Sequence, residues 1–394
     1  MKPRILVLTA GYGEGHNAAA RALAAACDEV HGPGTALMVD VFELAAPRFS
    51  RISRKAYIDL INTVPKAWSA VYAWADRSTI LPRLFWVLRR ERQILEELIE
   101  RERPTVICST YPVYAFLLEI IGRKRPVVAP HFNIVTDSIS INALWWRAGS
   151  AGWFVPNQDS ADVMRRAGVE AERLHVSGFP VARFFSANEG QLQPPDLAAG
   201  AAPRVLYIIN SGTRGAVETA QRLLAESEWE VTCAVGRDEK LRQQLTPLAT
   251  GRARRAEILG WTDQIPRLLM THHVVVSKAG GATTQESIAA KCPMLVNQIV
   301  PGQEEGNYEL LRRHGAGALA ETPDVLIREL RRAFADGGCG WRSWREALAR
   351  MARPDAAREI VGRVVALSVP PRESEPSPLG AARQPEDPVA AVGT

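Results

Sequence analysis

Short apolar runs alternate along the chain with longer stretches in which apolar residues recur every three or four positions. In the first half, the runs "RILVLTA", "TALMVDVF", "PTVICST", "AGWFVPN" and "ERLHVSGFP" predict buried strands, and "PVVAPHFNIVTD" predicts one or two more. The intervening pattern predicts helices over residues 17–30 and 113–123. Apolar strands separated by helices are typical of a parallel sheet that is covered on both faces.

A stretch rich in proline, glycine and alanine, "SANEGQLQPPDLAAGAAP", interrupts this alternation and predicts a linker. Strands and helices then resume from "RVLYIIN" to "CPMLVNQ". Two doubly wound α/β domains around a cleft, with the linker at the hinge, account for this pattern. The predicted divisions are an N-terminal domain (1–185), a linker (186–203), a C-terminal domain (204–340), C-terminal helices of which the last could pack on the N-terminal domain (341–368), and a disordered tail (369–394).

Composition adds few constraints to this picture. The chain has 394 residues, 46% hydrophobic residues and a formal charge of +5. Its five cysteines are scattered, with no metal-binding or CxxC spacing, which favours reduced thiols in a cytoplasmic protein. We expect no bound metal and no membrane-spanning helix, since the apolar runs are shorter than the roughly 18 residues that a span requires.

The stretch "SKAGGATTQES" carries the most chemical information in the second domain. Gly280 and Gly281 follow a strand and let the backbone come close to a ligand. Thr283 or Thr284 could open the next helix, whose N-terminus favours an anion such as a diphosphate. Glu286, which we expect in the first turn, could accept hydrogen bonds from two ribose hydroxyls. A simple capped turn with a stabilising glutamate explains the same residues equally well.

Other polar turns follow neighbouring strands of the same predicted sheet. "NSGTRG", "GRDEKL" and "PGQEEGN" each come at a strand end, and Trp261 after "ILG" could stack on a base or simply belong to the rim of the core. Ligands of open α/β sheets bind at the carboxyl edge of the strands. Several such turns at one edge favour a nucleotide-diphosphate site.

The glycine-rich opening, "TAGYGEGHNAAA", lacks both the spacing of the dinucleotide fingerprint and the Lys-Ser/Thr of a P-loop. His16 stands where this loop enters a helix. Its imidazole could act as a base toward an acceptor hydroxyl, hold the acceptor, or stabilise a diphosphate, and a structural role at the helix start is the alternative.

Together these motifs resemble glycosyltransferase family 28, whose nearest relatives in pattern are monogalactosyldiacylglycerol synthases and processive diacylglycerol glucosyltransferases. The resemblance covers about residues 3–365 and rests on "TAxxGxGHxxAA" and on the pattern from Ser277 to the PGQEExN turn. It implies a GT-B fold, which is two Rossmann-like doubly wound domains facing a cleft. It also implies a UDP-sugar donor, UDP-glucose or UDP-galactose, and a lipid acceptor.

The resemblance also implies roles for individual residues on the donor side. Glu286 would bind ribose, Trp261 would pack on uracil, and the glycine turn would approach the diphosphate. The full set of implied donor-site residues is Ser211, Arg237, Trp261, Gly280, Gly281, Thr283, Glu286, Glu304 and Glu305, the last two contacting sugar hydroxyls.

On the acceptor side, the resemblance places Gly13 and Gly15 in the wall of the cleft and makes His16 and Asp137 the two candidate bases. Asp137 lies in "FNIVTDSISINALWW", where many relatives carry a histidine a few residues later and this chain has Asn142. The turn "SGFPVARFF" departs similarly, because alanine follows the PV where relatives often have arginine.

Residues 48–90 interleave arginines and lysines with tyrosines, tryptophans and phenylalanines. Basic amphipathic helices with aromatics can lie on an anionic membrane surface. The same mixture occurs in nucleic-acid-binding segments, but no other feature supports that, and we expect no nucleic-acid partner. An ordinary helical face with core aromatics is the third interpretation.

These observations predict an inverting hexosyltransferase that needs no cofactor and acts on 1,2-diacylglycerol as a peripheral protein of the inner, cytoplasmic membrane face. Alternatives are a UDP-sugar transferase with another lipid or polyprenyl acceptor, a non-catalytic UDP-sugar-binding regulator, and a UDP-GlcNAc epimerase on a similar fold. Neither the sugar nor the number of sugars added follows from the sequence.

Overall fold

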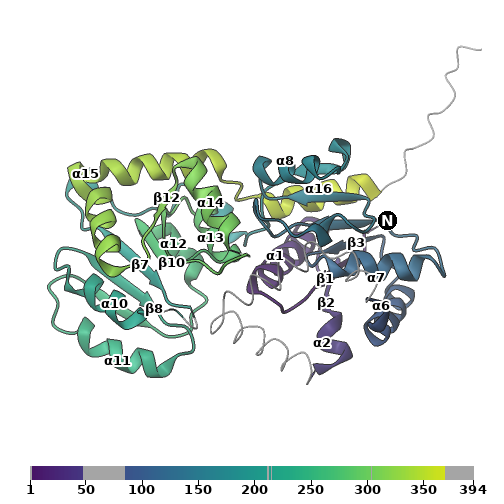
Figure 1. Cartoon of the computed structure of the whole chain (residues 1–394), viewed down its shortest axis with the longest axis horizontal. Helices are drawn as coiled ribbons and strands as arrows, with labels where there is room; N and C mark the ends of the chain where they lie inside the picture. The colour runs from purple at the N-terminus through teal and green to yellow at the C-terminus, as the bar shows by residue number, and fades with distance from the viewer. Residues whose placement is uncertain (1, 48–84, 211–212, 214, 303, 369–394) are drawn as a thin grey trace, which may run out of the picture.

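The chain folds into two lobes, each built on one parallel sheet of six strands (Figure 1). The structure is a computed structural model that describes residues 2–47, 85–210, 213, 215–302 and 304–368. The predicted fold class, a GT-B arrangement of two Rossmann-like units, is confirmed. The basic and aromatic stretch between 48 and 84, Ser211, and the predicted tail lie outside the described residues.

The sheet of the first lobe has the strand order β2-β1-β3-β4-β5-β6. Its strands are β1 (Ile5–Thr9), β2 (Ala36–Asp40), β3 (Val106–Ser109), β4 (His131–Ile134), β5 (Gly152–Val155) and β6 (Leu174–Val176). The helices between them are α1 (Glu14–His31), α2 (Val41–Ala45), α6 (Arg89–Glu102), α7 (Val113–Gly122) and α8 (Gln158–Arg166), and α9 (Phe184–Ala187) follows the last strand. The order changes direction between β1 and β3, which makes that point the switch point of the sheet.

The sheet of the second lobe has the order β12-β11-β10-β7-β8-β9, the arrangement found in dinucleotide-binding folds. Its strands are β7 (Arg204–Ile208), β8 (Glu230–Ala234), β9 (Ala256–Leu259), β10 (Val274–Lys278), β11 (Met294–Gln298) and β12 (Gly317–Leu319). The helices are α10 (Ala216–Ala225), α11 (Glu239–Ala249), α12 (Ile265–Thr271), α13 (Gly281–Ala289), α14 (Glu305–His314) and α15 (Pro323–Met351). The switch point lies between β7 and β10.

The unbroken apolar runs form strands because both faces of each sheet are buried. In β1, Ile5 and Val7 join the core on one face, and Leu6 and Leu8 join the core on the other. Successive side chains of a strand point to opposite faces, so a strand that is covered on both sides must be apolar at every position. The same split occurs in β7.

The last described helix, α16 (Ala356–Ser368), returns to the first lobe, where Figure 1 shows it in yellow beside the blue elements. Ile360, Val361 and Val364 are buried there in the core that includes Ile5 and Leu23. The chain therefore passes between the lobes twice, once after β6 and once after α15. The predicted domain boundaries themselves stay a prediction.

Several element boundaries differ from the sequence-based expectation. Helix α1 begins at Glu14, three residues early, because Gly13 adopts a φ of 147° that turns the chain into the helix and Glu14 suits a helix N-terminus. Helix α15 consists of two helical segments, because the backbone at 335–338 is not helical and Asp336, Gly337 and Gly338 have positive φ. Strand β12 was not predicted, since three residues give too little pattern.

Candidate functional site

A cavity of about 1350 Å³ opens at the carboxyl edge of the second sheet, beside its switch point. Segments after β7, β8, β9 and β10 line it, and α1 of the first lobe contributes one wall. Its polar lining includes Glu14, Arg21, Asn210, Thr213, Glu218, Arg237, Asp238, Thr262, Asp263, Thr283 and Glu286. The predicted residues Arg237, Trp261, Thr283 and Glu286 are thus brought together in one site.

The turn after β10 presents the start of α13 to this cavity. The helix begins at Gly281, with Gly280 as an extended N-cap residue and no side-chain cap. Without a capping side chain, the first N–H groups of the helix stay available to an anionic ligand. The expectation that Thr283 or Thr284 opens the helix is wrong, and Glu286 lies in the second turn, not the first.

Thr283 and Glu286 are one turn apart on the cavity side of α13. Burial raises the pKa of Glu286 to about 7, and the nearby Glu14 carboxylate adds to this effect, whereas Arg21 opposes it. The ionised carboxylate accepts hydrogen bonds at both oxygens, whereas the protonated acid turns one oxygen into a donor, so the charge of Glu286 decides how well it can accept from a pair of hydroxyls.

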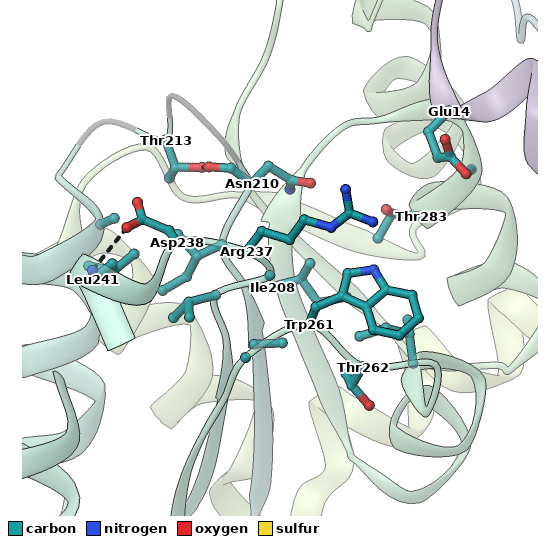
Figure 2. A pocket seen from close by; sticks show the side chains of 18 of the residues that line it. Glu14, Ile208, Asn210, Thr213, Arg237, Asp238, Leu241, Trp261, Thr262 and Thr283 are labelled. Carbon is teal, nitrogen blue, oxygen red and sulfur yellow. Dashed lines mark hydrogen bonds between the residues drawn. The ribbon is translucent and has the colours of Figure 1, made fainter. Parts of the chain in front are cut away.

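Arg237 and Trp261 come from the turns after β8 and β9. Figure 2 shows the Arg237 side chain extended into the cavity in the direction of Thr283, with Trp261 in the same space. Trp261 is 66% exposed, so its indole face is open to a planar ligand rather than buried in the core. Asp238 is occupied in capping α11, where it accepts a hydrogen bond from the Leu241 N–H at 3.0 Å.

Glu304 and Glu305 do not line this cavity. Glu304 is buried, and its carboxylate accepts from Lys278 Nζ at 2.6 Å and from the Val300 N–H at 3.0 Å. It lies beside the glycine turn, since a Cβ on Gly280 would stand 3.8 Å from Glu304 Oε1. Glu305 is exposed at the start of α14. Their contact with a sugar stays a prediction.

His16 lies in the first turn of α1, at the switch point of the first sheet, and its ring is buried. Its Nδ1 is 2.6 Å from the Thr110 carbonyl oxygen and 2.9 Å from Thr136 Oγ1. A carbonyl oxygen only accepts, so Nδ1 carries the proton and Nε2 carries the lone pair. Burial lowers the pKa of His16, which keeps the ring neutral near pH 7. A neutral ring with its lone pair on Nε2 can take a proton from a hydroxyl.

Asp137 follows β4 and is held by the indole of Trp145, whose Nε1 donates to Asp137 Oδ2 at 2.8 Å. Burial raises the pKa of Asp137, while the positive charge of a protonated His16 and the Trp145 hydrogen bond work against this rise. Trp145 also flanks the His16 ring, with 6.4 Å between the ring centroids. The two candidate bases therefore share one neighbourhood, yet His16 Nδ1 is bonded to a backbone carbonyl and not to Asp137.

Glycines at the lobe interface let the two lobes come close. A Cβ on Gly15 would lie 3.7 Å from the backbone N of Ala282, at the start of α13. A Cβ on Gly306 would lie only 1.9 Å from the Ser138 carbonyl oxygen, so α14 can meet this segment only with a glycine there. Gln285 Nε2 also donates to Ser138 Oγ at 2.9 Å. The segment that carries Asp137 therefore touches the second lobe directly.

Sequence reasoning missed Glu14, Arg21 and Gln285. The signal for the first two was the spacing of Glu14, Ala18 and Arg21, which places them on one face of a helix. The sequence does not indicate which part of the molecule this helix face contacts. Gln285 stands inside the recognised motif, but its partner Ser138 is 147 residues away.

Among the described residues, no cluster of histidine, cysteine or acidic side chains is arranged to hold a metal ion. No helix in the described part of the chain is both long and apolar enough to cross a membrane.

Comparison with known proteins shows which families the chain resembles. The family model for monogalactosyldiacylglycerol (MGDG) synthase matches residues 16–181. The processive diacylglycerol beta-glucosyltransferase of Bacillus cytotoxicus is 24% identical over 364 residues, which are 91% of this chain and 92% of the relative. That of Bacillus cereus strain AH820 is 23% identical over 372 residues, which are 92% and 94% of the two chains.

Solved structures share the fold at low identity. Acinetobacter baumannii MurG superposes with a TM-score of 0.58 at 14% identity and covers 92% of this chain and 100% of its own. The UDP-GlcNAc 2-epimerase of Neisseria meningitidis, bound to UDP-GlcNAc, gives a TM-score of 0.57 at 11% identity, with 92% and 100% covered.

Fold, site and relatives together define an enzyme of the glycosyltransferase class with the GT-B fold. Within that class, the resemblance to glycosyltransferase family 28, and in it to the monogalactosyldiacylglycerol synthases and processive diacylglycerol glucosyltransferases, is confirmed.

Proposed function

We propose that this enzyme transfers a hexose, glucose or galactose, from its UDP-sugar to 1,2-diacylglycerol with inversion at the anomeric carbon. The names of the full-length relatives support the acceptor and the reaction. The donor is supported by the cavity of the second lobe, which is the single observation that carries the proposal.

The cavity has the parts that a nucleoside diphosphate sugar needs. It lies at the carboxyl edge of the sheet next to the switch point, where α/β folds bind nucleotides. The uncapped start of α13 and the Arg237 guanidinium would face the diphosphate, Glu286 would accept from the ribose hydroxyls, and Trp261 would stack on the uracil. We keep Ser211, Glu304 and Glu305 as proposed contacts of phosphate and sugar.

His16 is the base that the geometry favours. Its Nε2 would remove the proton of the acceptor hydroxyl while the hydroxyl oxygen bonds to C1 of the sugar. The bond from C1 to the phosphate oxygen breaks in the same displacement, and its electron pair leaves with UDP. Attack from the face opposite the leaving group inverts C1. Asp137 would stabilise the protonated imidazole through its charge.

A lipid acceptor would bring the enzyme to a membrane surface. We propose a peripheral association with the cytoplasmic face of the cell membrane. The net charge of +5 suits an anionic lipid surface. Closure of the two lobes over the donor would exclude water and limit its hydrolysis.

The product of the reaction tests this function. The purified chain is incubated with UDP-glucose or UDP-galactose and with vesicles that contain diacylglycerol, a polyprenyl phosphate, or neither, and the lipids are analysed by mass spectrometry. We expect hexosyl-diacylglycerol from one of the two donors. If the only product is a hexosylated polyprenyl lipid, the acceptor is a polyprenyl lipid and not diacylglycerol. Binding of nucleotide sugar without any product would favour a non-catalytic regulator.

A further inference from the structure

Helix α1 of the first lobe reaches into the donor cavity with two charged side chains. Glu14, Ala18 and Arg21 lie on one face of this helix, and all three line the cavity. Figure 2 shows Glu14 on this helix, facing the cavity across from the second lobe. Arg21 and Glu14 form an ion pair. The alanine between them leaves room for a ligand against the helix.

The opposite wall at this point is α13, which packs against α1. Thr283 and Glu286 are the polar residues of α13 in the cavity lining. The closeness of the two walls is visible at Gly15, where a Cβ would stand 3.7 Å from the Ala282 backbone N. A donor bound against α13 therefore lies next to the ion pair of α1.

We propose that the Glu14–Arg21 ion pair is the first lobe's own contribution to the donor site, where it sets the charge balance around Glu286 and so the strength of nucleotide-sugar binding. This inference rests on the proposed function, which makes Glu286 the ribose-binding carboxylate. The Arg21 guanidinium favours the ionised form of Glu286. Glu14 positions Arg21 through their ion pair, and its own negative charge disfavours that ionised form.

The charges around Glu286 support this arrangement. Of the groups that act on Glu286, the Glu14 carboxylate disfavours its ionised form and the Arg21 guanidinium favours it. Helix α12 lines the cavity with Ile265 and Pro266. The remaining charged side chains of the described lining are Glu218, Arg237, Asp238 and Asp263, on other segments of the second lobe.

The consequence is a binding affinity that rises with pH through the neutral range, with a midpoint near the Glu286 pKa of about 7. Removing the Arg21 charge should move this midpoint up, and removing the Glu14 charge should move it down. If the midpoint rises from about pH 7 to about pH 8, the ionised fraction at pH 7 falls from about one half to about one tenth, which weakens binding by up to about five-fold.

The experiment measures the affinity of the full chain for UDP-glucose, with UDP-galactose in parallel, by calorimetry between about pH 6 and pH 8.5. The diphosphate of a nucleotide sugar is fully ionised across this range, so its titration does not interfere. The variants are Arg21→Met and Glu14→Gln. Arg123→Met is the matched control, because Arg123 also forms an exposed ion pair, with Glu119, and stands at the C-terminal cap of α7, outside the cavity lining.

We expect Arg21→Met to shift the midpoint upward, Glu14→Gln to shift it downward, and Arg123→Met to leave it unchanged. If the ion pair had only a structural role, both substitutions would weaken nucleotide-sugar binding by the same factor at every pH, and that result would overturn the inference. Affinity profiles that stay unchanged in both variants would overturn it as well. If the wild-type chain binds neither nucleotide sugar, the proposed function itself fails and the inference falls with it.

Discussion

At the scale of single residues, the chemistry depends on the tautomer of His16. The Thr110 carbonyl oxygen, 2.6 Å from Nδ1, fixes the proton on that nitrogen and leaves Nε2 as the basic atom. Burial keeps the ring neutral by lowering its pKa. A base of this kind needs no metal and no covalent intermediate.

His16→Ala should therefore lower the turnover number by about 10²- to 10⁴-fold while nucleotide-sugar affinity changes little. Because the pKa of His16 is lowered, the acid limb of the wild-type turnover number, measured at saturating nucleotide sugar, should lie below the ordinary histidine value of about 6.5. Steady-state kinetics across pH, together with calorimetry of donor binding, measure both effects.

Asp137→Asn is the comparison for this variant, since an amide can still accept from Trp145 while the charge is lost. We expect a smaller loss than for His16→Ala, because Asp137 acts on His16 through its charge. If Asp137→Asn abolishes turnover and His16→Ala does not, then Asp137 is the base and our assignment is reversed.

His16 could be singled out from sequence because it belongs to a recognisable motif, but its partners could not. Thr110 and Thr136 lie 94 and 120 residues away, and only the folded first sheet brings them to the ring. The position of Glu14 and Arg21 in the donor cavity could not be predicted either, because it depends on α13 of the other lobe.

At the scale of elements, two glycines inside helices differ in their surroundings: one lies in a tight contact between the lobes, and the other has open space around it. Gly306 sits in the first turn of α14, where a Cβ would collide with the Ser138 carbonyl oxygen at 1.9 Å. Gly362 sits inside α16 and has no atom within 4 Å of such a Cβ.

Gly306→Ala should lower turnover and reduce the free energy of unfolding by about 1 kcal/mol or more, because the two lobes must separate to admit the methyl group. Gly362→Ala, its control, should be neutral or stabilise by up to about 1 kcal/mol through helix propensity. Denaturant unfolding and steady-state kinetics measure both variants. Equal effects of the two substitutions would show that the packing of 138–140 against α14 is unimportant.

A pair of buried histidines connects the start of β10 to the linker and to α15. His273 accepts from the Arg204 N–H at 2.9 Å and lies 2.8 Å from the Pro195 carbonyl oxygen, while the Trp341 indole donates to the His273 carbonyl at 2.7 Å. Burial lowers the pKa of His272 and of His273 to about 4.

Between about pH 6.5 and pH 4 the unfolded chain binds more protons at these histidines than the folded chain does, so stability should fall as pH falls through this window. The limiting slope is about 1.4 kcal/mol per pH unit for each histidine. Denaturant unfolding at several pH values measures it, and His273→Gln should reduce the slope. An unchanged slope in that variant would contradict the assignment.

Much of the element pattern could be predicted because strands buried on both faces carry continuous apolar runs, such as Ile5–Leu8 and Val274–Val276. The start of α13 could not, because its N-cap is Gly280, which carries no capping side chain to give a signal. Thr283 and Thr284, a few residues later, gave a false signal for the start of the helix. Strand β12 was missed since Gly317–Leu319 is too short to show a period.

At the scale of the whole molecule, the return of α16 makes the first lobe depend on the end of the described chain. Ile360 is fully buried in the core of the first sheet, whereas Leu367 on the same helix is 50% exposed. The lobes are therefore joined by two chain segments, and α16, the last helix of the described chain, belongs to the first lobe.

Ile360→Ala should lower the free energy of unfolding by about 2–5 kcal/mol, since it leaves a cavity in that core. Leu367→Ala should cost well under 1 kcal/mol, because half of its side chain already meets water. Denaturant melts of the two variants give the comparison. Similar costs at both positions would mean that α16 does not pack on the first sheet.

The central claim, transfer of a hexose from a UDP-sugar to diacylglycerol, is tested most directly by the acceptor dependence of UDP release. The purified chain is given UDP-glucose or UDP-galactose with vesicles that hold or lack diacylglycerol, and UDP and glycolipid are quantified together. The account predicts that UDP appears only with diacylglycerol, in equal amount to the hexose bound to lipid, and that His16→Ala lowers the rate of both by about 10²- to 10⁴-fold. Consumption or epimerisation of the nucleotide sugar at the same rate without any lipid would contradict it.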